Sequence, residues 1–439
     1  MPPASCDAGP PATTSPLAPA ADRPLRRARH GLEPFRARAL TWGPRRVGAA
    51  AAAAAVAFVL LRLLIAADGD VTRFVVAGDL FVDRGAVADD TGVDLHVLPG
   101  PGYDGQFFWR LAVDPGRWGS EHDGVRFDNA YRPPRIGYPL LAFAASAGQA
   151  GAVAGALVAV NVAAVGAAGY AAARLARLAG RPAVWGLLVV AAPGLVLALG
   201  RDLAECVTVA CVLGGLVALQ RDRVGAATLL WSYAVLTREQ ALVTVGAYAL
   251  WRFAAIGRRR SRPGRPDLAW VVPGLVYLAW QLVLWRNIGE LPAGAAGGSN
   301  IVPPFSDMVP GLVKWAQGEL PRLHWIAPLQ LAGTLVLLAA AVRALRPPAV
   351  PVAHDPPQGA PPPGTDRGFL AIALGVATLA ATCLAASVWR DPSDLRHLVD
   401  VSTYGALVLV TSPPRVPAWA PATVAAVWAV TVAARVLAI

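Results

Sequence analysis

An aspartate in front of a short apolar helix is the residue best placed to do chemistry in this sequence. Asp104 precedes residues 105–114, which can form one helix. Phe107, Phe108 and Leu111 would then share an apolar face, and we expect such a helix to lie along a membrane surface. A carboxylate fixed at its start can act as a general base that takes the proton from an attacking hydroxyl group. The alternative is that this aspartate only caps the helix, since Asp is a favoured N-cap residue.

Arginines near the ends of apolar runs are candidates for holding a phosphate group. A guanidinium group matches two phosphate oxygens at once, which makes arginine well suited to this role. A second interpretation is that these residues anchor spans at the lipid headgroups or form local ion pairs between helix ends. The candidates are Arg132, Arg135, Arg238 and Arg396.

Further polar residues on the same side of the chain could support such a site. Glu205 and Glu239 stand at the starts of apolar runs, where they could orient the arginines or simply pair with them. Asp79 follows the first apolar run, and its alternative role is a solvated or capping residue. The full supporting set is Asp79, Gln106, Tyr131, Arg201, Asp202, Glu205 and Glu239.

The composition indicates a membrane protein. Hydrophobic residues make up 55% of the 439 positions and charged residues only 15%, where a soluble domain carries nearer to a quarter. Several apolar runs are long enough to cross a bilayer. The four cysteines show no spacing typical of a zinc site or a disulfide framework.

We therefore predict an all-α polytopic membrane protein with about eleven transmembrane helices. Residues 1–46 form a basic, disordered cytoplasmic tail, and residues 47–439 form a single transmembrane domain. The segment 137–149 is too short to span alone and is expected to begin the second span at the interface. The predicted spans are 47–67, 150–173, 183–199, 203–219, 224–236, 240–257, 268–285, 324–342, 369–388, 395–411 and 417–437.

The distribution of arginine sets the expected orientation. When the spans alternate, the basic tail and the arginine-rich short loops fall on one side, which we take as cytoplasmic. This sorting accounts for the net charge of +11 without a nucleic-acid partner. A Pro-rich loop at 346–366 also falls inside, whereas the long loops 68–136 and 286–323 fall outside the cell membrane. Every candidate site residue is then extracytoplasmic. The first outer loop is rich in aromatic residues and paired charges, which argues against disorder.

Short motifs around these residues resemble those of the GT-C superfamily of polyprenyl-phosphate-sugar glycosyltransferases. Tyr103-Asp104-Gly105-Gln106-Phe107-Phe108 resembles the Trp-Asp-x-x-x-Phe stretch of the GPI mannosyltransferase II family. The segment 135–141 resembles that family's Phe-Phe-Pro-x-x-Pro-Leu segment. Glu205 falls at its Tyr-x-Glu-Ser element and 237–239 at its Thr-Arg-Ser-Asn element. The chain looks closer still to uncharacterised bacterial GT-C-like membrane proteins, and the resemblance covers about residues 47–250.

This resemblance implies that Asp104 is the catalytic carboxylate of a glycosyltransferase. A sugar (mannose or another hexose or pentose) would pass from a polyprenyl-phosphate donor to an outer-face acceptor, by an inverting single displacement. The acceptor would be a glycan, glycolipid or protein of the cell envelope. A lipid-phosphate donor requires no nucleotide site, so no cofactor is assigned, and a divalent cation is left open.

The competing interpretation is a multi-pass transporter or lipid flippase. Such proteins typically contain internal repeats and polar or broken helices at the middle of the membrane. The sequence shows no repeat, and its charges stand at the ends of the predicted spans. These two features favour the transferase.

Overall fold

The computed structural model describes residues 40–295, 301–318, 326–346, 366–390, 396–412 and 419–437. Gly43–Ile439 forms one compact unit, and of the other unit, Met1–Trp42, only residues 40–42 are described. The predicted tail 1–46 and the Pro-rich loop 346–366 therefore lie mostly outside the described residues, as do parts of 286–323.

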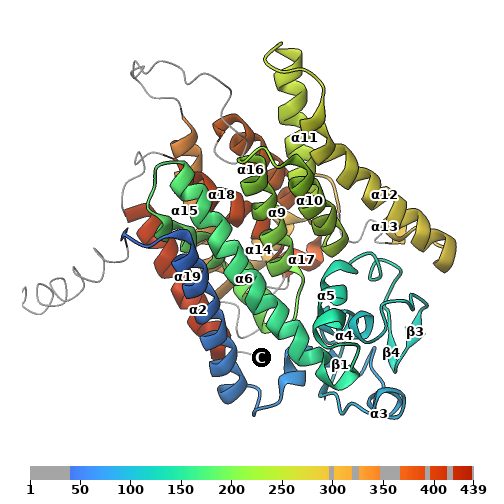
Figure 1. The fold of residues 1–439 in the computed structure, drawn as a ribbon. Coiled ribbons are helices and arrows are strands. Elements are labelled where there is room, and N and C mark those ends of the chain that lie inside the picture. The colour runs from blue at the N-terminus through green and yellow to red at the C-terminus, as the bar shows by residue number, and fades with distance from the viewer. Residues whose placement is uncertain are drawn as a thin grey trace, which may run out of the picture. The chain divides into compact units, whose positions relative to one another are not determined.

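Helices dominate the described chain (Figure 1). The longer ones are α2 (Pro44–Ile65), α6 (Val153–Leu178), α9 (Glu205–Leu219), α10 (Val224–Thr237), α11 (Ala241–Gly257), α12 (Leu268–Ile288), α15 (Ile326–Leu345), α16 (Arg367–Thr382), α18 (Val399–Thr411) and α19 (Trp419–Leu437). The shorter ones are α3 (Arg84–Thr91), α4 (Gly105–Val113), α5 (Gly137–Ala145), α7 (Leu187–Val190), α8 (Pro193–Gly200), α13 (Pro292–Ala295), α14 (Met308–Ala316) and α17 (Ala386–Arg390). Short 3-10 turns are η1 (Val71–Phe74), η2 (Ala150–Ala152), η3 (Ala183–Gly186) and η4 (Arg265–Asp267).

The predicted spans correspond to helices, although not all of them have the length of a full span. Within the described residues, four helical segments are long and apolar enough to cross a membrane: Pro44–Ile65, Ala150–Leu178, Arg265–Ile288 and Pro328–Leu345. The spans predicted around α9, α10, α11 and α16 fall on apolar helices of 10–17 residues, as the last predicted span does on the segment Trp419–Ala434 of α19. The membrane class is thus supported, whereas eleven spans and their orientation stay predictions.

The predicted span 183–199 is not one straight helix. It consists of Ala183–Val190 and Pro193–Gly200, which meet at a bend of 61°. The cause is local, because Pro193 has no N–H to donate and its ring obstructs the preceding turn of a helix. A broken span or a re-entrant segment fits this geometry equally well.

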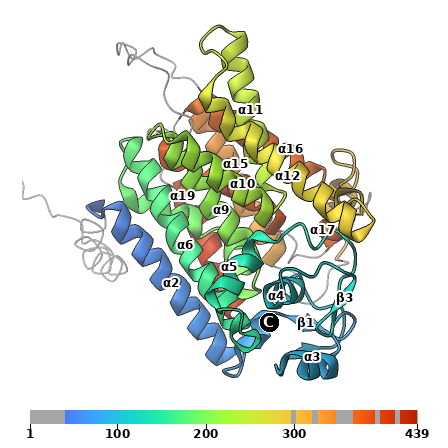
Figure 2. The same ribbon diagram turned by 45° about the vertical axis from the view of Figure 1, so that its right-hand side comes forward.

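Small residues let α2 and α6 pack closely. The two helices run side by side in both views (Figures 1 and 2). A Cβ atom on Gly48 would lie 2.9 Å from Cβ of Tyr170, and one on Gly169 would lie 2.8 Å from Cβ of Ala51. Such close approach by small side chains is the usual way in which membrane helices associate.

The remaining long helices continue this packing through two series of neighbours. One series runs from α6 to α9, α10 and α12, and the other from α11 to α16, α18, α15 and α19. Helix α19 also contacts α2, and α18 contacts α6, so the two series are joined. The helix ends and turns that carry the candidate charges at 205, 238–239 and 396 are thereby brought toward one another.

The first outer loop folds into an ordered layer, as its composition predicted. Strand β1 (Ala77–Gly78) pairs in parallel with β2 (Val97–Leu98), with Ala77 opposite Val97. Strand β3 (Glu121–His122) pairs antiparallel with β4 (Val125–Arg126). The hydrophobic core beneath them includes the buried side chains of Leu95, Trp109, Leu111 and Val125.

Helix α4 confirms the predicted helix after Asp104 but not its predicted surroundings. Phe107, Phe108 and Leu111 are buried as expected. Every residue from Gly105 to Ala112 is also buried, including Arg110, which is only 1% exposed. Protein therefore surrounds this helix on all sides, and it does not present one apolar face to lipid.

Candidate functional site

Asp104 lies at the centre of a buried group of charges. Its carboxylate accepts hydrogen bonds from Nη1 of Arg132 at 2.7 Å, Nη1 of Arg135 at 3.2 Å and Nη2 of Arg396 at 2.7 Å. Asp104 occupies the N-cap position of α4, but its side chain accepts no capping bond. The capping interpretation is therefore wrong, and so is the view that Arg132 and Arg135 only anchor a span at the headgroups. Together these side chains form the arginine–carboxylate cluster.

The surroundings of Asp104 stabilise its charged form. Burial alone would raise the pKa of this carboxyl group, but Arg132, Arg396 and Arg135 outweigh burial and hold the pKa well below its usual value of 3.8. A carboxylate bound in this way is a strong anchor for cations. It is a weak proton acceptor until some of those guanidinium groups turn to another anion.

Glu205 extends the cluster to the start of α9. Its carboxylate accepts a hydrogen bond from Nη1 of Arg396 at 3.1 Å and another from Nη1 of Arg238. Glu205 is fully buried and stands in the first turn of its helix, where the helix dipole stabilises a negative charge. Arg396 thus joins Glu205 to Asp104 across separate elements.

Glu239 closes the other side of the cluster. Nε and Nη2 of Arg135 donate to its two oxygens at 3.0 and 2.9 Å, and the Tyr131 hydroxyl donates to it as well. Burial would raise the pKa of Glu239, but Arg135 and Arg238 lower it to about 2. Burial and the neighbouring Glu239 raise the pKa of Tyr131 to about 12. The phenol is therefore a neutral donor.

Two glycines allow the elements to come this close. A Cβ atom on Gly105 would lie 2.5 Å from the Val75 carbonyl oxygen and 2.7 Å from that of Arg201. One on Gly137 would lie 2.4 Å from Oγ1 of Thr237. These backbone approaches hold Asp104 against the turn that precedes Glu205, and they hold the segment of Arg132 and Arg135 against the end of α10.

Arg238 differs from Arg132 and Arg135 in the hydrogen bonding of one edge of its guanidinium group, the edge formed by Nε and Nη2. The Nε and Nη2 atoms of Arg132 contact Asp128 at 2.7 and 2.5 Å, and the same edge of Arg135 contacts Glu239. In Arg238, which is 1% exposed, Nε and Nη2 are buried and have no partner among the described residues. Buried donors without partners are costly, and this edge matches two oxygens of a phosphate group. It is the best anion site in the cluster.

Several predicted supporting residues lie outside the cluster. Asp79 is exposed and accepts from the Gly100 backbone N–H, so its role is in a turn. Gln106 is buried, accepts from Gly78 N–H and donates to the Pro101 carbonyl, which locks the outer loop together. Both act through local structure rather than on a ligand.

Arg201 and Asp202, which precede α9, differ in their relation to the cluster. The Arg201 guanidinium lies 4.6 Å from the centre of the Tyr103 ring. The guanidinium of Arg396 lies 4.9 Å from the centre of the same ring. Asp202 is fully buried, with neither carboxylate oxygen bonded to any described group. Arg201 therefore borders the cluster through Tyr103, whereas Asp202 is not one of its ion-pairing members.

Sequence reasoning missed two acidic residues of this region. Asp128 holds Arg132, and its position four residues earlier is the spacing that a helical turn would bring together. Asp400 follows Arg396 by four residues and lies within electrostatic reach of Arg238 and Glu239. The spacing from a candidate arginine was the available signal in both cases.

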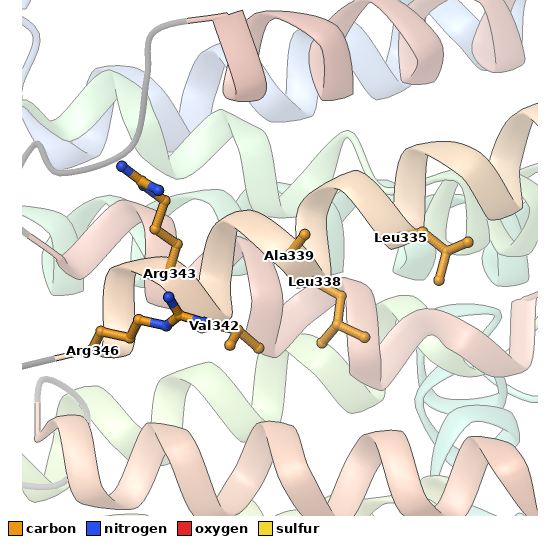
Figure 3. Close-up of a pocket in the computed structure, with 6 residues that line it drawn as sticks. All are labelled: Leu335, Leu338, Ala339, Val342, Arg343 and Arg346. Carbon is orange, nitrogen blue, oxygen red and sulfur yellow. The ribbon is translucent and has the colours of Figure 1, made fainter.

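Metal ligation and the one pocket drawn in Figure 3 do not point to a second site. No group of three or more His, Cys, Asp or Glu side chains in the described ranges could hold a metal ion. A groove of about 520 Å³ follows α15, with aliphatic side chains along it and arginines at one end (Figure 3). None of the predicted site residues lines this groove. Its lining is Leu335, Leu338, Ala339, Val342, Arg343 and Arg346.

Comparison with known proteins does not place the chain: no family model, no curated protein and no solved structure matches it.

Proposed function

We propose that this chain is a membrane-embedded glycosyltransferase that takes a sugar from a polyprenyl-phosphate donor and passes it to an acceptor hydroxyl. The observation that carries the proposal is the position of Asp104 in a buried arginine cluster beside the partnerless edge of Arg238. An anion site next to a carboxylate is what transfer from a phosphate-linked sugar needs. The apolar helices around it suit a lipid-linked donor.

Charge balance within the cluster determines how a phosphate would enter. The guanidinium groups of Arg132, Arg135, Arg238 and Arg396 face the carboxylates of Asp104, Asp128, Glu205 and Glu239. Since the charges already balance, a bound phosphate must compete with the carboxylates for the arginines. We infer that phosphate on Arg238 draws Arg396 and Arg135 away from Asp104. Asp104 then becomes basic only when the donor is present.

The reaction would be a single displacement. The acceptor oxygen attacks the anomeric carbon while its proton passes to Asp104. The bond between that carbon and the phosphate oxygen breaks, and the electron pair leaves with the polyprenyl phosphate. Arg238 and Arg396 stabilise the charge that develops on the leaving oxygen. Attack opposite the leaving group inverts the anomeric configuration. The proposed site faces the outside of the cell membrane, and no metal is required for these steps.

The decisive experiment uses purified protein and a panel of radiolabelled polyprenyl-phosphate sugars. Wild type should turn over at least one donor, and Asp104→Asn should lower that turnover by about 10² to 10⁴ without loss of folded protein. Asp267→Asn is the matched control, because Asp267 pairs with Arg252 away from the cluster. Turnover that is undiminished in Asp104→Asn would refute the role of this residue. Addition of a chelator tests in the same assay whether a divalent cation is needed.

One observation supports the second candidate function, a transporter or lipid flippase. The helices α7 and α8 meet at a 61° bend, and discontinuous helices often line transport sites. Asp202 follows α8 and is buried with no described partner. This candidate predicts substrate flux in liposomes that Asp202→Asn abolishes. Flux without turnover of any donor would replace the transferase proposal.

A further inference from the structure

The starts of α11 and α18 meet beside the arginine–carboxylate cluster. The hydroxyl groups of Thr244 and Tyr404 form a hydrogen bond of 2.5 Å, and each residue lies in the first turns of its helix. Gln240 and Asp400 precede these two residues by four positions each, which is about one helical turn. Their side chains are therefore placed at the common start of the two helices, where Arg238 also lies.

Both of these side chains present acceptors that nothing in the described part of the chain satisfies. Asp400 lies within electrostatic reach of Arg238 and Glu239 but forms no ion pair or hydrogen bond with any described residue. The Oε1 atom of Gln240 is buried and also has no partner among them. Asp400 interacts electrostatically with Arg238, whose Nε and Nη2 donors have no described partner, and Gln240 follows Arg238 by two positions. The site thus combines one anion-binding edge with two acceptor groups.

We propose that Asp400 and Gln240 bind hydroxyl groups of the sugar whose phosphate lies on Arg238. The inference rests on the proposed function, because it takes the phosphate-linked sugar as the ligand. A sugar is attached directly to its phosphate, so its hydroxyls must lie next to Arg238. Hydroxyl groups are the donors that a carboxylate and an amide oxygen require.

The test measures kcat/KM for a series of deoxy donors, each of which lacks one sugar hydroxyl. Every donor is assayed with wild type, with Asp400→Ala and with Gln240→Leu. For wild type, removal of a contacted hydroxyl should lower kcat/KM about fivefold to hundredfold, because it leaves a protein acceptor group without its hydrogen bond. In Asp400→Ala the same deoxy donor should lose almost nothing relative to the parent donor. Asp366→Asn is the control, since Asp366 caps α16 and asparagine caps equally well. It should retain the wild-type pattern.

The outcomes separate the two proposals. If wild type turns over a donor but every deoxy penalty is unchanged in Asp400→Ala and in Gln240→Leu, this inference is overturned and the transferase stands. If wild type turns over no donor at all, the transferase proposal fails and this inference fails with it. Thermal melting of each purified variant in detergent will show whether it folds. If Asp400→Ala does not fold, Gln240→Leu alone still tests the inference.

Discussion

Two buried arginines of this protein, Arg252 and Arg238, have opposite surroundings. Arg252 donates to Asp267 through Nε at 2.7 Å and through Nη2 at 3.2 Å. It also donates to Oγ of Ser261 at 2.7 Å and to the Arg262 carbonyl oxygen at 3.0 Å. Arg238 uses only Nη1, and its other edge has no partner within the described ranges. The first arginine is saturated, whereas the second is not.

The separation of the partners along the chain differs in the same way. Asp267 and Ser261 lie within 15 residues of Arg252, so its bonds fix one loop between α11 and α12. In the arginine–carboxylate cluster, Arg396 binds Asp104 across 292 positions. A local, saturated ion pair is explained by the structure that it holds together. A cluster assembled from distant segments with donors left over is better explained by a ligand.

The largest expected effect is that of Asp104→Asn on catalysis. The change keeps the size of the side chain but removes the proton acceptor and one anchor of the arginines. Loss of a general base usually costs about 10² to 10⁴ in rate, and kcat should fall in that range. Turnover of the best donor by purified protein measures it. A normal kcat in this variant would show that the arginine–carboxylate cluster has only a structural role, like the ion pair of Arg252.

The next largest effect is expected from Arg238→Gln on donor binding. Charge-assisted hydrogen bonds contribute about 1.5–3 kcal/mol, so the donor should bind roughly tenfold to a hundredfold more weakly. The melting temperature should change little, because two of the three guanidinium nitrogens that are removed are buried donors without a described partner, which offsets the lost bond to Glu205, and Arg396 still pairs with Glu205. Isothermal titration with a polyprenyl-phosphate sugar measures the affinity. Unchanged affinity would show that the partnerless edge is not the phosphate site.

Arg252→Gln should show the reverse pattern. Four hydrogen bonds are lost and Asp267 is left with fewer donors, so we expect a destabilisation of about 1–3 kcal/mol. Donor affinity and kcat of the folded fraction should equal those of wild type. Thermal melting in detergent and the turnover assay together test both halves. A loss of catalysis without a loss of stability would contradict the contrast between the two arginines.

Sequence alone predicted the helices better than the site. Apolar periodicity was enough for the helix at 105–113, because Phe107, Phe108 and Leu111 had to be buried together. It could not distinguish a capping Asp104 from one held by arginines, since Arg396 is distant in sequence. The break before Pro193 was accessible from the properties of proline and was missed.

The misplaced supporting residues have a common cause. Asp79 and Gln106 were grouped with the site because they stand on the predicted outer side, but local backbone groups engage both. Asp400 was overlooked because it lies inside a predicted span, where its position relative to Arg238 depends on how α11 and α18 pack. The side of the membrane on which a residue lies limits the residues that it can contact. Only tertiary packing determines which of these contacts form.

The smallest expected effect concerns the stability of the fold at low pH. It tests whether the arginine–carboxylate cluster holds Glu239 in its charged form. The pKa of this group is about 2 in the folded chain, against an ordinary value of 4.5. A depressed pKa means that ionised Glu239 stabilises the fold at all pH values above about 4.5 and that this contribution is lost as pH falls toward 2. The pKa of Asp104 is depressed in the same direction, so it adds to the same acid transition. The melting temperature of wild type should therefore decline as pH falls below about 4. In Glu239→Gln the decline should be shallower, because one of the two linked protonations is gone, while Arg135 still binds Asp104. An acid transition as steep in Glu239→Gln as in wild type would mean that the cluster does not hold Glu239 in its charged form.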